Sequence, residues 1–192
     1  MTTEALYKEL NYVNHSREKR LHYANLVIDH PELIPKLLDI LFRVDDKISC
    51  RAAWVFEFMC SKDIESCIPY LDVFTENIHR VHLDPAVRPV AKVCECLANA
   101  YYGKEDNNVK NTLLHHHKEK IVESCFDWLI NDEKVAPKAY GMNALYLLGT
   151  EIDWIHPELA LILERDFSSQ SAAFKARARH ILKKINKQKS RS

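Results

Sequence analysis

Residues 31–60 have the sequence PELIPKLLDILFRVDDKISCRAAWVFEFMC, and this stretch decides the fold. Its first half opens on a proline, which suits a first helical turn because its missing N–H has no partner there. Four leucines follow at the spacing of one buried helix face. Asp45 and Asp46 interrupt the pattern and place carboxylates at the start of a second helix, which is apolar nearly all round. We therefore predict two packed helices, of which the second is strongly buried.

The same unit recurs along the chain. Further first helices are expected in residues 64–78, 117–130 and 156–167, and further second helices in residues 85–102, 135–149 and 171–185. Each second helix carries a small alanine followed six positions later by a larger apolar residue, and these alanines are Ala53, Ala91, Ala139 and Ala176. They lie 38, 48 and 37 residues apart, and the tetrapeptide HPEL occurs at two corresponding points. Periods of this size are typical of stacked helical pairs.

Helical pairs entered through proline, with a tight alanine in the second helix, resemble HEAT-type repeats, and the resemblance covers roughly residues 30–185. The Asp-then-Arg ladder of that family is present only in part, as Asp46 with Arg51 and Asp84 with Arg88. The resemblance implies an all-α fold. It would be a right-handed α-α superhelix, a HEAT/armadillo-like solenoid of about four helical pairs plus an N-terminal helical hairpin. Folds of this kind mostly serve as binding scaffolds.

The chain is also similar to short bacterial proteins that sometimes carry the label adenylosuccinate lyase. Lyases of that type are much longer, assemble their active sites from several subunits, and have a serine-rich mobile loop with a Met-Pro-Lys pattern. Ser168, Ser169 and Gln170 lack the rest of that pattern. The label therefore has no supporting motif in this sequence, and we expect no lyase activity.

Composition and charge narrow the function classes. The length of 192 residues is typical of a single domain. The chain contains 27 Lys and Arg residues and 27 Asp and Glu residues. From residue 167 onward there are eight basic residues and no acidic one, which leaves 19 basic against 27 acidic residues before it. Only three glycines are present, which argues against β-rich folds and glycine-rich phosphate loops. We expect one solenoid domain over residues 1–188 and a basic tail over residues 189–192.

The sequence also indicates in which cellular compartment the protein is expected. No apolar run approaches the roughly 18 residues of a membrane-spanning helix, and the N-terminus has no basic-then-apolar signal. We expect a cytoplasmic protein with no membrane partner and no cofactor. The cysteines lie inside apolar helical patterns, so we predict small buried side chains rather than disulfides. The six cysteines are Cys50, Cys60, Cys67, Cys94, Cys96 and Cys125.

Two short clusters contain metal-ligating residue types. The string His115-His116-His117 offers three imidazoles, but consecutive helical residues point about 100° apart, so three in a row do not converge on one ion. Cys94 and Cys96 lie on different faces of one helix, whereas metal sites usually have two intervening residues. We predict a solvated helix start, ordinary core cysteines and no metal site. The carboxylates are scattered along the chain and belong to no recognisable catalytic motif, so no catalytic residue is predicted.

The strongest functional signal is two rows of residues on the predicted second helices. The position after each alanine holds Trp54, Lys92, Tyr140 and Arg177, and the position four past it holds Glu57, Glu95, Asn143 and His180. Residues four apart share a helix face and equivalent residues of stacked repeats lie side by side, so both rows should line the inner surface. Trp, Tyr and Arg are enriched in binding hot spots, and a carboxylate among apolar neighbours must be exposed or paired.

These rows support one main hypothesis, a non-enzymatic scaffold that holds an unidentified protein or peptide in a concave groove. Trp54 and Tyr140 are alternatively plain core residues. A second hypothesis is nucleic-acid binding through the basic C-terminal helix, because HEAT-like alkylpurine DNA glycosylases use a related fold. Those proteins have a basic groove along the whole solenoid, whereas the first 166 residues here are acidic. That basic helix is alternatively a capping helix with a solvated outer face.

Overall fold

The computed structural model describes residues 1–189, and within them the chain is all helical, with no strand. Residues 190–192 of the predicted basic tail lie outside this part. The α-helices are α1 (Thr3–Glu9), α2 (Arg17–Asp29), α3 (Ile34–Leu41), α4 (Lys47–Lys62), α5 (Leu71–Asn77), α6 (Asp84–Tyr102), α7 (Val109–Thr112), α8 (His115–Ile130), α9 (Val135–Leu148), α10 (Ile155–Asp166) and α11 (Ala172–Lys189). Short 3-10 helices are η1 (Leu10–Tyr12), η2 (Pro31–Leu33), η3 (Ile64–Tyr70) and η4 (Ile78–Arg80).

Helices α2 and α4 begin where short polar side chains accept hydrogen bonds from their free N–H groups. The Ser16 hydroxyl accepts from the Lys19 N–H at 3.2 Å at the start of α2. The Asp46 carboxylate accepts from the Ile48 N–H at 2.9 Å at the start of α4, as expected from the acidic break in the sequence. Asp46 also accepts from the Tyr7 hydroxyl at 2.7 Å, which ties α1 to α4. Local sequence therefore sets these two helix boundaries.

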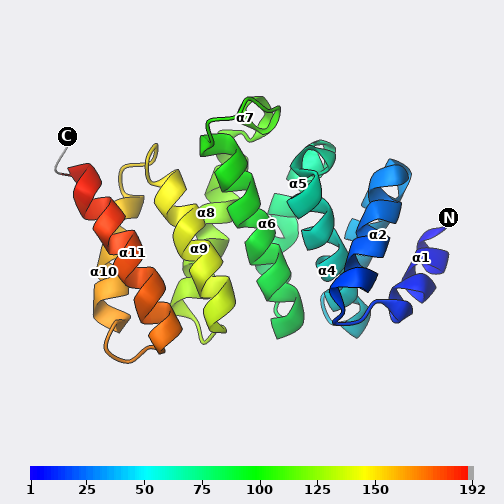
Figure 1. Ribbon diagram of the computed structural model, residues 1–192, viewed down its shortest axis with the longest axis horizontal. Coiled ribbons are helices and arrows are strands. Elements are labelled where there is room, and N and C mark those ends of the chain that lie inside the picture. The colour runs from blue at the N-terminus through cyan, green and yellow to red at the C-terminus, as the bar shows by residue number, and fades with distance from the viewer. Residues whose placement is uncertain (190–192) are drawn as a thin grey trace.

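The helices are arranged in two rows (Figure 1). In one row α2, α4, α6, α9 and α11 each pack on the next, and we refer to it as the second-helix row. The other row contains α3, α5, α8 and α10, with α3 on α4, α8 on both α5 and α9, and α10 on both α9 and α11. Figure 1 shows the chain advancing along the longest axis, with the two ends of the molecule formed by α1 and α11. Neighbours in space are thus mostly neighbours in sequence.

The core lies between the two rows. Phe56 of α4 and Phe74 of α5 are both 1% exposed, and their ring centroids are 5.4 Å apart. Each large apolar side chain buried in this way contributes about 1.5–3 kcal/mol to the driving force for folding. Five of the six cysteines are buried and Cys96 is half-buried, which confirms the prediction of packed side chains, and all six are free in the structure. None of the helices in residues 1–189 has the length and hydropathy to cross a bilayer.

The alanine alignment holds in only part of the second-helix row. Ala53 of α4 and Ala91 of α6 are buried, but Ala139 is half-buried and Ala176 is exposed. Gly141 of α9 lies close to α8, and a Cβ added there would lie 3.3 Å from the Cys125 carbonyl oxygen. The buried alanine that the alignment predicted is therefore present in α4 and α6, only half-buried in α9 and exposed in α11.

The partial Asp-then-Arg ladder does not form as ion pairs in the described residues. Arg51 donates to the Leu10 carbonyl oxygen at 3.3 Å instead of bonding to Asp46. Asp84 lies 3.5 Å from the Lys134 ammonium, and Arg88 points to a carboxylate on α4. These cations therefore tie separate helices together rather than forming a ladder within each repeat.

Candidate functional site

Trp54 lies in α4 between α2 and α6. Its side chain is 8% exposed, and its indole Nε1–H donates to the Pro85 carbonyl oxygen in the first turn of α6 at 2.7 Å. The Arg20 guanidinium of α2 lies over the ring, 4.5 Å from its centroid. The buried N–H is therefore satisfied, and Trp54 forms a floor beneath a cation instead of projecting into solvent.

A pocket of about 530 Å³ opens between α2, α4 and α6, and we refer to it as the cationic pocket. It is lined by Arg17, Arg20, Leu21, Glu57, Phe58, Ser61, Lys62 and Arg88. Four of these side chains are cationic and one is a carboxylate. Arg17 and Arg20 form no ion pair with any described carboxylate, and Lys62 donates to the Asn25 amide oxygen at 2.7 Å. The pocket therefore has an excess of positive charge.

Glu57 is the carboxylate of the cationic pocket. It is 7% exposed, and its Oε2 accepts from the Arg88 guanidinium at 2.9 Å. Burial raises the pKa of Glu57 above its usual value, and the attraction of Arg88, Arg20 and Lys92 only partly opposes this. Burial, followed by repulsion from Arg88, lowers the pKa of Arg20. Several cations thus surround a single carboxylate, and this excess of positive charge favours the binding of a second anion.

Lys92, Glu95 and Tyr140 form the next group along the row. The Lys92 ammonium lies 2.6 Å from the Glu95 Oε2 and 4.9 Å from the Tyr140 ring centroid. Glu95 is 6% exposed, and the carboxylate at this point in the sequence is therefore paired rather than open. Its bond to Lys92 helps to raise the pKa of the lysine, against the effect of burial. This group joins α6 to α9.

The remaining predicted residues lie further along the row. The Asn143 amide of α9 donates to the Asn99 amide oxygen of α6 at 3.3 Å, and Asn143 is half-buried. Arg177 is half-buried and His180 is exposed, both on α11. Neither makes a hydrogen bond or ion pair to the other predicted residues within the described chain. The structure therefore brings six of the eight together across α4, α6 and α9 and leaves two on the last helix.

Sequence reasoning missed most of the cationic pocket. Arg88 lies one helical turn before Lys92, and this spacing of four could have placed it on the same face. Arg17 and Arg20 belong to the predicted N-terminal helical hairpin, which stands outside the four repeating pairs. The contact of α2 with α4 makes that helix the first member of the second-helix row. The hairpin has no counterpart of the four aligned alanines, so the repeat pattern did not place its arginines in either row.

Three cations of α11 make contacts with other parts of the same chain. Lys175 donates to the Ser168 carbonyl oxygen at 3.0 Å, Arg179 lies over the Phe167 ring at 5.3 Å, and Lys184 lies over the Tyr146 ring at 4.9 Å. These contacts join α11 to α9 and to the end of α10. The helix therefore has a packing role at this end of the molecule.

The histidine string starts α8 and forms a small cluster with Asp72 of α5. His116 Nε2 and His117 Nε2 lie 3.0 Å and 2.7 Å from the same Asp72 carboxylate oxygen, an arrangement in which a metal ion could be held. However, the Leu114 backbone N–H donates to His117 Nδ1 at 3.1 Å. That bond uses the Nδ1 lone pair, so the proton of the imidazole is on Nε2 and is donated to Asp72.

Metal-ligating histidines have the opposite arrangement, in which the second ring nitrogen donates a proton to an acceptor. The helix cap at Leu114 therefore disfavours metal binding through His117 Nε2, and the cluster is better explained as hydrogen bonding between α5 and α8. The two imidazoles lower the pKa of Asp72, with the bond from His116 first and that from His117 second. His115 points elsewhere, with its Nε2 3.3 Å from the Glu119 carboxylate.

No protein-family model, curated protein or solved structure matches the chain. A function must therefore be argued from the residues of the site.

Proposed function

We propose that the protein is a non-enzymatic binding module that holds an acidic peptide, or an acidic segment of a partner protein, against its second-helix row. In this proposal the row is the concave face of a right-handed HEAT-like superhelix, and the protein works in the cytoplasm, where six free cysteines stay reduced. A single observation carries the proposal. The cationic pocket contains four cationic side chains around one buried carboxylate.

The charge balance of the cationic pocket supports an anionic ligand. Glu57 is already paired with Arg88, whereas the charges of Arg17, Arg20 and Lys62 have no carboxylate partner within the described residues, so a ligand carboxylate could pair with them. Arginine forms paired hydrogen bonds with carboxylates through its planar fork of N–H groups. A peptide carrying two or three closely spaced Asp or Glu side chains fits this set of donors.

Apolar surface beside the cations favours a peptide over a free inorganic anion. The Phe58 ring lies below Arg17 and Arg20, with centroid distances of 5.9 Å and 5.8 Å to their guanidinium carbons. Leu21 is 38% exposed at the rim. An acidic peptide with an apolar side chain among its carboxylates would cover these groups and bury both kinds of surface.

Nucleic-acid binding is the second candidate function, and the same observations support it less well. A polyanion needs cations along an extended track. Beyond Lys92 the row continues with Tyr140, Asn143 and Asn99, which are neutral, before the cations of α11. The positive charge of the cationic pocket is therefore local, which matches a short acidic segment better than a phosphate backbone.

The test uses three fluorescein-labelled probes of matched length: a twelve-residue Asp/Glu-rich peptide with one Leu and one Phe, its Asn/Gln counterpart, and a single-stranded oligo-dT. Binding is measured by anisotropy at 50 mM and 300 mM salt. The key variant is Arg17→Glu. Residue 17 occupies the first turn of α2 after the Ser16 cap, where a carboxylate is favourable for the helix dipole, so the fold should be retained.

We expect the acidic peptide to bind and its Asn/Gln counterpart not to bind. Arg17→Glu should weaken binding about tenfold, since it replaces one attraction by one repulsion of about 0.5–1 kcal/mol each. Lys104→Glu, on the exposed loop after α6, has the same change in net charge and should stay within twofold of wild type. Equal loss in both variants, or absence of binding, would refute the proposal. Tighter binding of the oligonucleotide than of the acidic peptide would favour nucleic acid as the ligand.

A further inference from the structure

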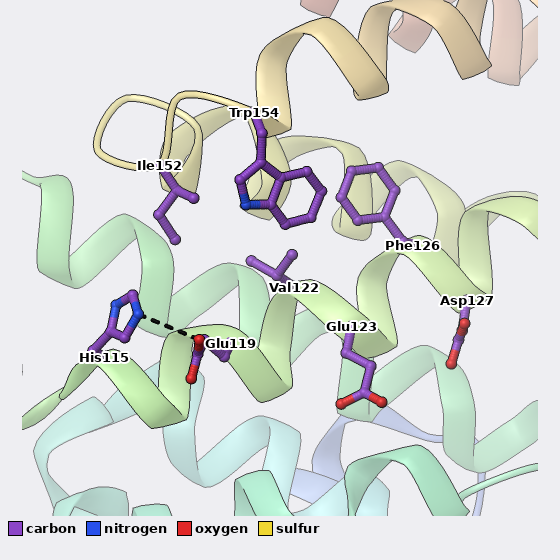
Figure 2. Close-up of a pocket in the computed structure, with 8 residues that line it drawn as sticks. All are labelled: His115, Glu119, Val122, Glu123, Phe126, Asp127, Ile152 and Trp154. Atoms are coloured by element: carbon purple, nitrogen blue, oxygen red, sulfur yellow. Dashed lines mark ion pairs between the residues drawn. The ribbon is translucent and has the colours of Figure 1, made fainter.

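The outer surface of α8 and the start of α10 form a second pocket, of about 480 Å³, on the first-helix row (Figure 2). We refer to it as the acidic groove. It is lined by His115, Glu119, Val122, Glu123, Phe126, Asp127, Ile152 and Trp154. None of these residues belongs to the cationic pocket. The acidic groove therefore needs an explanation of its own.

The floor of the acidic groove is apolar. Trp154 is 56% exposed at the start of α10, and its ring stacks on Phe126 of α8 with centroids 5.6 Å apart and planes 21° apart. Val122 lies below the two rings and Ile152 beside them (Figure 2). Trp54 and Trp128, the two other tryptophans, are 8% and 5% exposed. An open aromatic surface of this kind is typical of a binding anchor.

Exposed apolar side chains continue along both helices. Ile130 is 54% exposed, one turn beyond Phe126 on α8. Leu161 is 61% exposed, two turns beyond Trp154 on α10, and residues seven apart share a helix face. Single exposed apolar residues are ordinary, but a group on two packed elements marks an interaction surface.

Carboxylates line one side of the acidic groove. Glu119, Glu123 and Asp127 follow one another at intervals of four residues along α8, which gives steps of about 6 Å on a single face. Figure 2 shows all three on the side of α8 away from Trp154. Glu119 is paired with His115 at 3.3 Å, Glu123 with Lys120 at 3.2 Å, and Asp127 makes no ion pair or hydrogen bond through its side chain to a described residue. The edge of the acidic groove therefore attracts cations.

We propose that the acidic groove binds a cationic amphipathic helix of a partner protein. Lys or Arg side chains four residues apart on that helix would face the three carboxylates, whose spacing they match. Leu, Ile or Phe side chains on its adjoining face would cover Trp154 and Phe126. This is recognition of a helix in a groove, with apolar anchors for contact area and rim charges for orientation and partner choice.

The probe is a fourteen-residue helical peptide of the sequence LKKLLKLLKKLLKL, which contains no tryptophan. Quenching of protein fluorescence by acrylamide reports on the acidic groove directly, because Trp154 is the exposed one of the three tryptophans. The peptide should protect this fluorescence from quenching. Trp154→Phe should remove the protection signal while an anisotropy titration with labelled peptide still shows binding, and Trp154→Ala should weaken that binding at least fivefold.

The double variant Glu123→Lys/Asp127→Lys tests the rim. Both residues are exposed on α8, so the fold should persist, and circular dichroism verifies it. Binding should fall at least tenfold. The matched control is Glu105→Lys/Asp106→Lys on the exposed loop after α6, which has the same net charge and should stay within twofold of wild type. Loss of binding in both double variants, unchanged binding in the rim variant, or binding without protection of Trp154 would each overturn the proposal.

Discussion

Replacing Glu151 by glutamine should destabilise the protein more than removing its cationic partner. Lys118 of α8 is 3% exposed, and its ammonium lies 3.0 Å and 2.8 Å from the two Glu151 carboxylate oxygens. The Tyr102 hydroxyl donates to the same carboxylate at 2.8 Å, and the Tyr101 ring centroid lies 3.7 Å from the ammonium. One carboxylate thus neutralises a buried cation between α6, α8 and the turn after α9.

The magnitude follows from the different burial of the two partners. Breaking a fully buried pair and leaving one charge behind costs about 3–5 kcal/mol. The Glu151 side chain is 44% exposed, so water can reach the site, and the Tyr101 ring still contacts the cation. We therefore expect Glu151→Gln to cost about 2 kcal/mol, somewhat below that range. Lys118→Met leaves a half-exposed carboxylate in contact with water and should cost less than about 1 kcal/mol.

The assay is thermal and urea unfolding of wild type, both single variants and the double variant at pH 7. For a chain of this size, about 2 kcal/mol corresponds to a fall in Tm of about 4–8 °C. The double variant should recover most of the loss of Glu151→Gln, because it no longer buries an unpaired charge. Lys118→Met being as damaging as Glu151→Gln, or no recovery in the double variant, would refute the reasoning.

The pH dependence gives a second measurement of the same pair. The bond from Lys118 is the main cause that holds the pKa of Glu151 below its usual value. A carboxylate with a lowered folded pKa contributes stability above its unfolded pKa of about 4.3, and this contribution is lost as pH falls through the folded pKa. The difference in Tm between wild type and Glu151→Gln should therefore shrink below about pH 4.

Three further outcomes are expected. Gly149→Ala should lower the free energy of unfolding by about 1–2 kcal/mol, since the new Cβ would lie 2.3 Å from His156 Cδ2 and displace that imidazole. The double variant Gly149→Ala/His156→Ala should recover part of this loss in a thermal melt. Asp46→Asn should flatten the loss of stability below about pH 4, because hydrogen bonds, first from the Ile48 N–H, lower the pKa of Asp46. Trp54→Phe should cost about 1 kcal/mol in urea unfolding, since it removes a partly buried hydrogen bond from the indole to the Pro85 carbonyl oxygen.

The sequence predicted the helices well because helix boundaries depend on neighbouring residues. Asp46 caps α4 at the acidic break that the sequence pattern indicated, and Ser16 caps α2 in the same way. The loop after α6 leads into the short helix α7, Val109–Thr112, which no hydrophobic periodicity predicts. The predicted burial of the alanine holds only in part in α9 and not in α11, because the buried side of a helix is set by the helices packed on it.

The candidate site was predicted in part. The rule that a carboxylate among apolar neighbours must be exposed or paired applied to both Glu57 and Glu95, and both are paired. Glu95 has its partner one turn away, at a spacing visible in sequence. The partner of Glu57 is Arg88, 31 residues further along the chain, and no local pattern connects them.

By itself, the sequence determined the all-helical architecture, the order of the helices, the burial of the cysteines and the helices that carry the eight predicted positions. These follow from periodicity, capping and composition, which act over a few residues. Only the tertiary structure placed Arg20 over Trp54, stacked Trp154 on Phe126, and turned His117 toward Asp72 with its Nδ1 used in a helix cap. Such contacts depend on the rotation and separation of packed helices, which are set by side-chain packing across the whole core rather than by any single stretch of chain.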